Sequence, residues 1–169
     1  MKELLRWVVV VLFAVLAAFL IRTYVFNIAV VPTESMAPSV LVGDRVLVYK
    51  IDKTIIRGDA VVFTLSEEIE QSLPNDMRGA LLLKRVIALP GESVEIVRGD
   101  VYINGELLEE PYVHEKGEDY MQKIELGDDE YFVLGDNRTN SFDARFWSRK
   151  FINASDINGK AVFRFGPIK

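Results

Sequence analysis

Cysteine is absent from this chain of 169 residues, and histidine occurs once, as His114. The lack of cysteine excludes thiol nucleophiles, thiolate metal sites and disulfides. A single histidine excludes zinc sites built on several histidines. His114 lies in the polar segment PYVHEKGED, residues 111–119, where we expect a surface position and not the base of a Ser-His-Asp triad. No loop pattern that would arrange oxygen ligands around a hard cation occurs either, so the sequence predicts no metal site.

Positive charge is scarce outside the N-terminal segment. The formal net charge of the chain is −5, and Lys2, Arg6 and Arg22 against Glu3 leave +2 in residues 1–26, so residues 27–169 carry −7. An acidic domain is a poor surface for a polyanion, and we therefore expect no nucleic-acid partner.

The longest apolar run, WVVVVLFAVLAAFLI, covers residues 7–21 and is shorter than the roughly 20 residues that span a bilayer. Two interpretations compete: a cleaved signal peptide, or a membrane anchor extended through Arg22 to about Ile28. The aliphatic residues after Arg22 favour the anchor, since the arginine can reach the headgroups. Trp7 and Tyr24 suit the two membrane interfaces.

The predicted organisation is a cytoplasmic tail and transmembrane anchor in residues 1–27, followed by one extracytoplasmic domain in residues 28–169. Lys2 and Arg6 precede the span, so the positive-inside tendency keeps the short tail in the cytoplasm. The sequence thus predicts a single-pass protein of the plasma membrane.

After the anchor, short apolar and β-branched segments alternate with turn signals, which predicts a mainly β fold. The expected strands are Ile28–Val31, Arg45–Tyr49, Asp59–Leu65, Ala80–Leu89, Ser93–Val97, Asp100–Ile103, Tyr131–Leu134 and Lys160–Phe165. Polar composition between Glu67 and Gly79, and acidic composition between Glu106 and Asp129, indicate solvated loops.

One serine follows the first expected strand closely: Ser35, in TESMAPS, residues 33–39. Most serines in turns are ordinary polar residues, and a nucleophilic serine needs a base. Lys84 is a candidate because it interrupts the apolar run GALLLKRVIALPG, residues 79–91. From the run alone, Lys84 is as compatible with a solvent-facing strand position as with burial. If it is buried, loss of solvation lowers its pKa toward the range useful for a base.

A polar cluster, GDNRTNSFDAR at residues 135–145, places Ser141, Asp143 and Arg145 at alternate positions. In an extended segment these three side chains lie on one side. They fit either a polar turn with a surface ion pair, or a loop in which Ser141 orients the lysine amine and the Asp-Arg pair supports it.

Together these segments resemble the bacterial type I signal peptidases. The family's boxes appear in order as SMAPS at 35–39, GDRVLV at 43–48, KRVIALPGE at 84–92 and GDNRTNSFDAR at 135–145, followed by INGKAVFRFGPI at 157–168. The resemblance implies a largely antiparallel β fold with Ser35 as nucleophile, Lys84 as base, and no metal or organic cofactor.

The resemblance also implies supporting roles. Thr33 falls at the position of an oxyanion-donating hydroxyl, with the backbone N–H of Ser35 as the second donor. Ser141 falls at the lysine-orienting serine, and Asp143 and Arg145 at its supporting pair.

The implied substrates are signal peptides of exported preproteins, with small residues of the Ala-x-Ala type before the cut. We expect an extended peptide to add to a sheet edge and to place alternate side chains in shallow apolar pockets. The expected lining of these pockets is Val31, Pro32, Met36 and Leu83.

The chain departs from the family pattern at Ser39 and Ala144, and in the short region between the last two boxes. The third departure predicts a reduced accessory β-lobe around residues 92–128. Two alternative functions remain: a non-enzymatic, membrane-tethered β domain that binds a partner, and a self-cleaving Ser/Lys regulator. The apolar N-terminal segment disfavours the regulator, because such proteins carry a DNA-binding segment there.

Overall fold

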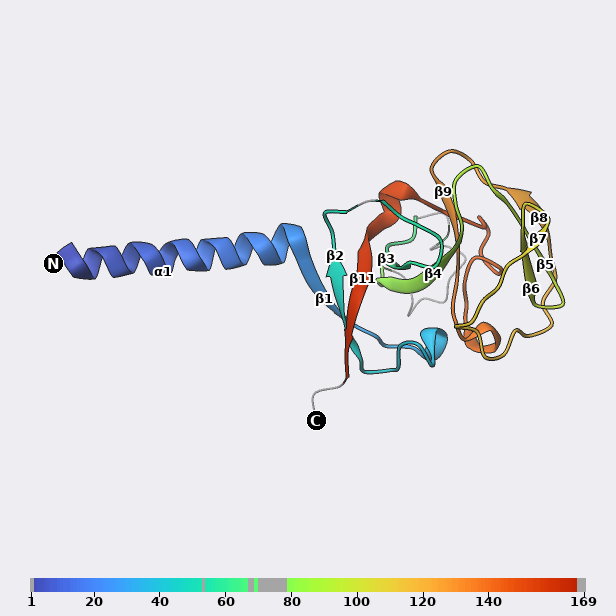
Figure 1. Cartoon of the computed structure of the whole chain (residues 1–169), viewed down its shortest axis with the longest axis horizontal. Coiled ribbons are helices and arrows are strands. Elements are labelled where there is room, and N and C mark those ends of the chain that lie inside the picture. Colours follow the sequence, from blue (N-terminus) through green and yellow to red (C-terminus); the bar gives the residue numbers. More distant parts are fainter. Residues whose placement is uncertain (1, 53, 67–68, 70–78, 167–169) are drawn as a thin grey trace.

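The structure, a computed structural model, describes residues 2–52, 54–66, 69 and 79–166. Helix α1, Lys2–Leu20, continues into a π-helical turn, Ile21–Val25, and extends away from the remainder of the chain (Figure 1). Together these form a candidate membrane span of 24 residues without buried side chains. At 1.5 Å per residue the span is about 36 Å long, enough to cross a hydrocarbon core of about 30 Å.

Strand β1, Phe26–Val30, begins directly after the helical turn. The helix therefore ends before Ile28, where the sequence indicated the end of the anchor, because Phe26 to Ile28 pair with Tyr49 to Leu47. Lys50 fastens the junction: its backbone N–H donates to the Val25 carbonyl at 2.9 Å, and its amine donates to the Thr23 carbonyl at 3.0 Å.

Within the described residues, the strands form two antiparallel sheets. The larger sheet has seven strands in the order β1-β2-β11-β3-β4-β9-β10. Besides β1, its strands are β2 (Arg45–Tyr49), β3 (Ala60–Phe63), β4 (Leu82–Ala88), β9 (Glu130–Leu134), β10 (Ile152–Asn153) and β11 (Ile157–Phe165). This architecture confirms the predicted mainly β fold.

The smaller sheet has four strands in the order β7-β6-β5-β8 and lies at the end of the domain farthest from α1 (Figure 1). Its strands are β5 (Ser93–Val97), β6 (Asp100–Ile103), β7 (Glu106–Leu107) and β8 (Met121–Glu125). The sheet lies within residues 92–128, the region expected to form the accessory lobe.

All eight expected strands are present, with some ends shifted, but β7, β8 and β10 were not expected. The predicted loop between Glu106 and Asp129 was therefore wrong in part. Strand β8 is mostly polar, and only Met121 and Ile124 in it pack on the core, so it lacks the apolar alternation that marks a strand. The loop predicted between Glu67 and Gly79 lies outside the described residues except at Ile69 and Gly79.

Strand β3 separates two apolar clusters because its side chains alternate between its faces. Val61 and Phe63 face the larger cluster, where the Phe63 and Trp147 ring centroids are 6.0 Å apart. Val62 faces a smaller cluster that includes Val31 and Met36. The smaller cluster therefore lies directly beneath the turn that carries Ser35.

Candidate active site

Ser35 lies in a single 3₁₀ turn, Glu34–Met36, whose buried end is fixed by packing. The Met36 side chain is completely buried in the smaller apolar cluster, which sets the direction of the turn. Ser35 is 7 % exposed, and its Oγ lies 3.1 Å from Oγ1 of Thr33. Two neighbouring hydroxyls are thus held within hydrogen-bonding distance.

Lys84 is on β4, opposite Val61 of β3, and is only 3 % exposed. This resolves the two positions that the sequence allowed in favour of burial. Loss of solvation lowers the pKa of Lys84 from its ordinary value of 10.5 to about 8. The charge of Arg145 also lowers this pKa, whereas the charges of Asp143 and Asp136 raise it. A buried lysine with such a pKa can accept a proton near neutral pH.

The two side chains line one cleft of about 700 Å³. All of the residues that the sequence assigned to the nucleophile, base, oxyanion and pockets line it: Val31, Pro32, Thr33, Ser35, Met36, Leu83 and Lys84. The cleft lies between the segment from Ile28 to Met36 and the start of β4. Val46 and Val62 also line it, and so do Asn140 and Phe142, which the sequence did not single out.

The segment Gly135 to Arg145, here called the arm, makes hydrogen bonds to the turn that carries Ser35. The backbone N–H of Asn137 donates to the Ser35 carbonyl at 3.1 Å. The side-chain amide of Asn137 donates to the Glu34 carbonyl at 3.2 Å, and that of Asn140 donates to the Glu34 carboxylate at 3.1 Å. Asn137 and Asn140 were missed because asparagines in a polar segment read as ordinary turn formers.

Asp143 and Arg145 form a buried pair and not the exposed pair that the sequence also allowed. Asp143 is fully buried, and its carboxylate accepts from Arg145 Nε at 2.8 Å and Nη2 at 2.9 Å. The same carboxylate accepts the backbone N–H of Gly135 at 3.0 Å. Asp143 therefore joins the two ends of the arm.

Ser141 is buried, and its backbone carbonyl accepts from Arg145 Nη2 at 3.3 Å. Its hydroxyl oxygen has no hydrogen-bond partner within the described part of the chain. A hydrogen bond from Lys84 to Ser141 is therefore not among the contacts of the structure, and the orienting role of Ser141 stays a prediction.

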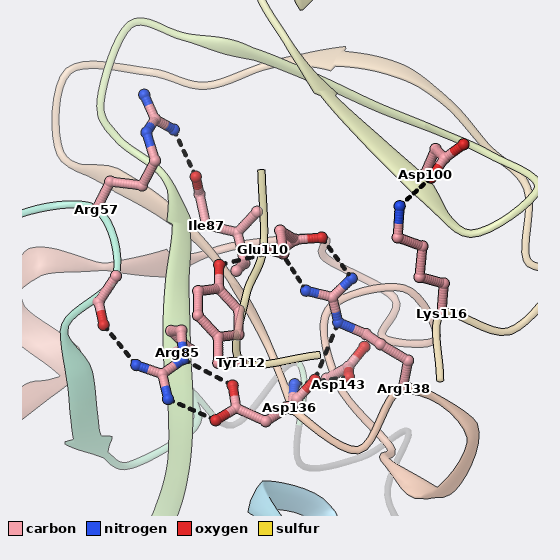
Figure 2. Close-up of polar contacts among 12 residues, drawn as sticks. Arg57, Arg85, Ile87, Asp100, Glu110, Tyr112, Lys116, Asp136, Arg138 and Asp143 are labelled. Atoms are coloured by element: carbon pink, nitrogen blue, oxygen red, sulfur yellow. Dashed lines mark hydrogen bonds and ion pairs between the residues drawn. The ribbon is translucent and has the colours of Figure 1, made fainter. Parts of the chain in front are cut away.

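Arg85 and Asp136 are a further pair that the sequence left unassigned. Arg85 Nε donates to the buried Asp136 carboxylate at 2.7 Å, and its Nη1 donates to the Gly58 carbonyl at 2.7 Å (Figure 2). The pair joins β4 to the arm at the residue next to Lys84. Arg85 directly follows Lys84 in the box KRVIALPGE, and this adjacency is the feature of the sequence that could have identified it.

Among residues 2–52, 54–66, 69 and 79–166, no group of three histidine, aspartate or glutamate side chains could hold a metal ion.

Three comparisons relate the chain to known proteins. The family model described as signal peptidase, peptidase S26, matches residues 4–166. Signal peptidase I of Leptolyngbya laminosa is 39% identical over 158 residues, which are 92% of this chain and 76% of that protein. Signal peptidase I S of Bacillus subtilis (strain 168) is 33% identical over 180 residues, covering 98% of this chain and 91% of that protein. A crystal structure of a signal peptidase I from Enterococcus faecalis V583 is 30% identical, with a TM-score of 0.48, and the match covers 63% of this chain and 96% of that chain.

The molecule is thus a serine endopeptidase with a mainly antiparallel β fold behind an N-terminal apolar helix. It belongs to the signal peptidase family, peptidase S26, whose members remove signal peptides from other proteins.

Gly135 gives a direct test of the packing between the arm and the Ser35 turn. A methyl group on Gly135 would lie 2.2 Å from Ser141 Oγ and 2.4 Å from the Ser35 carbonyl oxygen. Gly135→Ala should therefore displace one or both residues and lower kcat/KM for preprotein cleavage about 100-fold or more.

The matched control is Gly166→Ala, because a methyl group there meets nothing within 4 Å. It should cleave like the unmodified protein. If Gly135→Ala cleaved as fast as Gly166→Ala, the close packing of the arm against Ser35 would be refuted.

Proposed function

We propose that the protein removes N-terminal signal peptides from exported preproteins by acyl-enzyme catalysis, with Ser35 as nucleophile and Lys84 as general base. The observation that carries this proposal is a serine and a buried lysine of lowered pKa on the lining of one cleft. With a pKa of about 8, roughly one tenth of the Lys84 amines are neutral at pH 7.

In the first step, neutral Lys84 takes the Ser35 proton as the Ser35 oxygen attacks the scissile carbonyl carbon. The Thr33 hydroxyl and the Ser35 backbone N–H stabilise the resulting oxyanion. The C–N bond then breaks, and the Lys84 ammonium gives its proton to the leaving amine. In the second step, Lys84 takes a proton from water as the water oxygen attacks the acyl-enzyme carbonyl carbon. The ester C–O bond to Ser35 then breaks, the Lys84 ammonium returns the proton to the Ser35 oxygen, and the signal peptide leaves with a new carboxylate. Ser141, Asp143 and Arg145 keep the base and its surroundings in place.

An extended substrate fits the edge of β4 that faces the cleft. Strand β9 pairs with β4 only from Arg85 onward, so Leu82 to Lys84 have no β9 partner within the described residues. A peptide added here would direct alternate side chains toward Val31, Pro32, Met36 and Leu83. Met36 and Val31 are themselves buried and fill the floor, which favours small residues of the Ala-x-Ala type before the cut.

Replacement of either reacting group tests the mechanism. Ser35→Ala and Lys84→Ala should each lower the rate of preprotein cleavage roughly 10³-fold or more, because nucleophile and base act as a unit. The measurement is cleavage, by the full chain in detergent micelles, of a preprotein whose signal peptide ends in Ala-x-Ala.

A second preprotein with leucine as the last signal-peptide residue controls for specificity and should be cleaved much more slowly. Lys123→Ala is the lysine control and should retain cleavage, since Lys123 is exposed on β8 and lies outside the lining of the cleft. Normal processing by either Ser35→Ala or Lys84→Ala would refute the Ser/Lys mechanism. Absence of processing by the unmodified chain would instead support the alternative of a membrane-tethered binding module.

The lowered pKa of Lys84 predicts the pH profile. Because the base must be neutral and its pKa is about 8, kcat/KM should fall about tenfold per pH unit below that value. Activity should level off above it until the protein unfolds. Circular dichroism at each pH separates unfolding from titration, and a rate at pH 5 equal to that at pH 8 would exclude Lys84 as the base.

We also propose that α1 anchors the protein in the plasma membrane with the N-terminus in the cytoplasm and residues 28–169 outside it. Lys2 and Arg6 at the start of the span support this orientation. A protease added to intact spheroplasts should therefore digest the β domain. Digestion only after the membrane is broken would reverse the orientation.

A further inference from the structure

Two arginines of the arm are paired with carboxylates from the chain that forms the four-stranded sheet. Arg138 pairs with Glu110, which follows β7, and Arg145 pairs with Asp119, which precedes β8. Both carboxylates come from residues 92–128, the region that the sequence predicts to form a reduced accessory β-lobe. Neither lines the cleft.

The Glu110 pair is the more deeply buried of the two. The side chains of Arg138 and Glu110 are 2% and 1% exposed. Arg138 Nη1 donates to Glu110 Oε2 at 2.9 Å, and its Nη2 donates to Oε1, so the contact is bidentate (Figure 2). Such a pair fixes the position of both groups more narrowly than a single hydrogen bond does.

Tyr112 completes the carboxylate's surroundings. Its hydroxyl donates to Glu110 Oε1 at 3.0 Å. The Arg85 guanidinium lies over its ring, with Cζ 4.2 Å from the ring centroid. Burial, and then the charge of Glu110, raise the pKa of Tyr112 above its ordinary value, so the hydroxyl stays protonated as a donor. The segment after β7 thus contacts two of the arginines around the site.

Arg138 connects Glu110 to other residues of the arm. Its Nε donates to the Gly135 carbonyl at 3.0 Å, and its own carbonyl accepts from Arg145 Nη2 at 2.8 Å. Gly135 packs against the Ser35 carbonyl and the Ser141 hydroxyl without room for a methyl group. A continuous series of contacts therefore leads from Glu110 through Arg138 and Gly135 to Ser35.

We propose that Glu110 is a positioning residue for signal-peptide cleavage: through Arg138 it holds the arm against Ser35 and beside Lys84. The proposal rests on the function proposed above. Replacing a buried ion pair by apolar residues is often neutral or stabilising, so stability alone is a weak reason for this pair. The contacts that Arg138 makes with the arm give a second reason for the pair.

The test is Glu110→Gln in the full chain in detergent micelles. For this variant and for the unmodified protein, kcat, KM and the pH profile of cleavage are measured, and the melting temperature is measured separately to report stability. Glutamine keeps the size of the side chain and one acceptor but removes the charge that pairs with Arg138. We expect kcat to fall about tenfold or more while KM changes less than about threefold. A displaced arm misplaces the reacting groups, whereas the expected pocket residues lie outside the arm: Val31, Pro32, Met36 and Leu83.

The pH profile distinguishes positioning from a loss of stability. Asp143, Arg145 and Asp136 are the charged groups that act on Lys84, and all belong to the arm. A loosened arm admits water to Lys84, which raises its pKa, so the midpoint of the profile should move up by about half a unit or more. A loss of folded protein alone would lower the amplitude and leave the midpoint in place.

Four further variants complete the experiment. Asp100→Asn removes an exposed ion pair with Lys116 in the same lobe and should leave kcat and the midpoint unchanged. Tyr112→Phe removes only the hydroxyl donor and should show a weaker form of the Glu110→Gln effect, which keeps the test open if Glu110→Gln folds poorly. Glu110→Gln combined with Arg138→Met should cleave no more slowly than Arg138→Met alone, because Glu110 acts through Arg138.

Wild-type kcat and midpoint in folded Glu110→Gln and in Tyr112→Phe would overturn the proposal. So would a fully additive double variant. Ser35→Ala, assayed in parallel, separates this result from failure of the proposed function: if Ser35→Ala is inactive while Glu110→Gln is normal, the Ser/Lys mechanism stands and Glu110 has no positioning role.

Discussion

The removal of the Lys84 amine from water is the constraint on which the rest of the site depends. A charged ammonium in an apolar strand is unfavourable, and the pKa of Lys84 falls to about 8 in consequence. The site keeps this lowered value although two carboxylates lie near enough to raise it. Asp143 is bonded to Arg145, and Asp136 to Arg85, so each carboxylate that could hold a proton on the lysine is already paired with an arginine. The arginines therefore limit how far these carboxylates raise the pKa of Lys84, and they also hold the arm in place.

Much of the fold could be predicted from the sequence, because the strands of the larger sheet are marked by β-branched and apolar residues between turn signals. Strand β2 was predicted with its observed ends, and so were β5 and β6. Strand β8 could not be predicted, because a mostly polar strand is held by its pairing with β5 and not by a pattern of its own. Its detection needs the tertiary neighbour, which a single sequence does not display.

The candidate site shows the same division between local and tertiary information. Ser35 and Lys84 were singled out by type and by their boxes, but the run around Lys84 left its burial open, since burial depends on strands packed from elsewhere. Glu110 was hidden for a different reason. Its acidic surroundings resemble a solvated loop, and only the position of Arg138 shows that this carboxylate is buried. Gly135 could not be identified from the sequence either, because its role is to leave room for Ser35 and Ser141, which lie beside it only in the folded chain.

The direct passage from the helical turn at Val25 into β1 at Phe26 has a consequence for the choice of cutting site. No linker separates the helical turn from the sheet, and Lys50, which follows β2, donates hydrogen bonds to the carbonyls of Thr23 and Val25 in that turn. With the helix in a bilayer, Ser35 would stand at a nearly constant height above the lipid. Under the mechanism proposed above, a substrate would be cut where its chain reaches that height, so distance from the membrane would act together with side-chain size in selecting the bond.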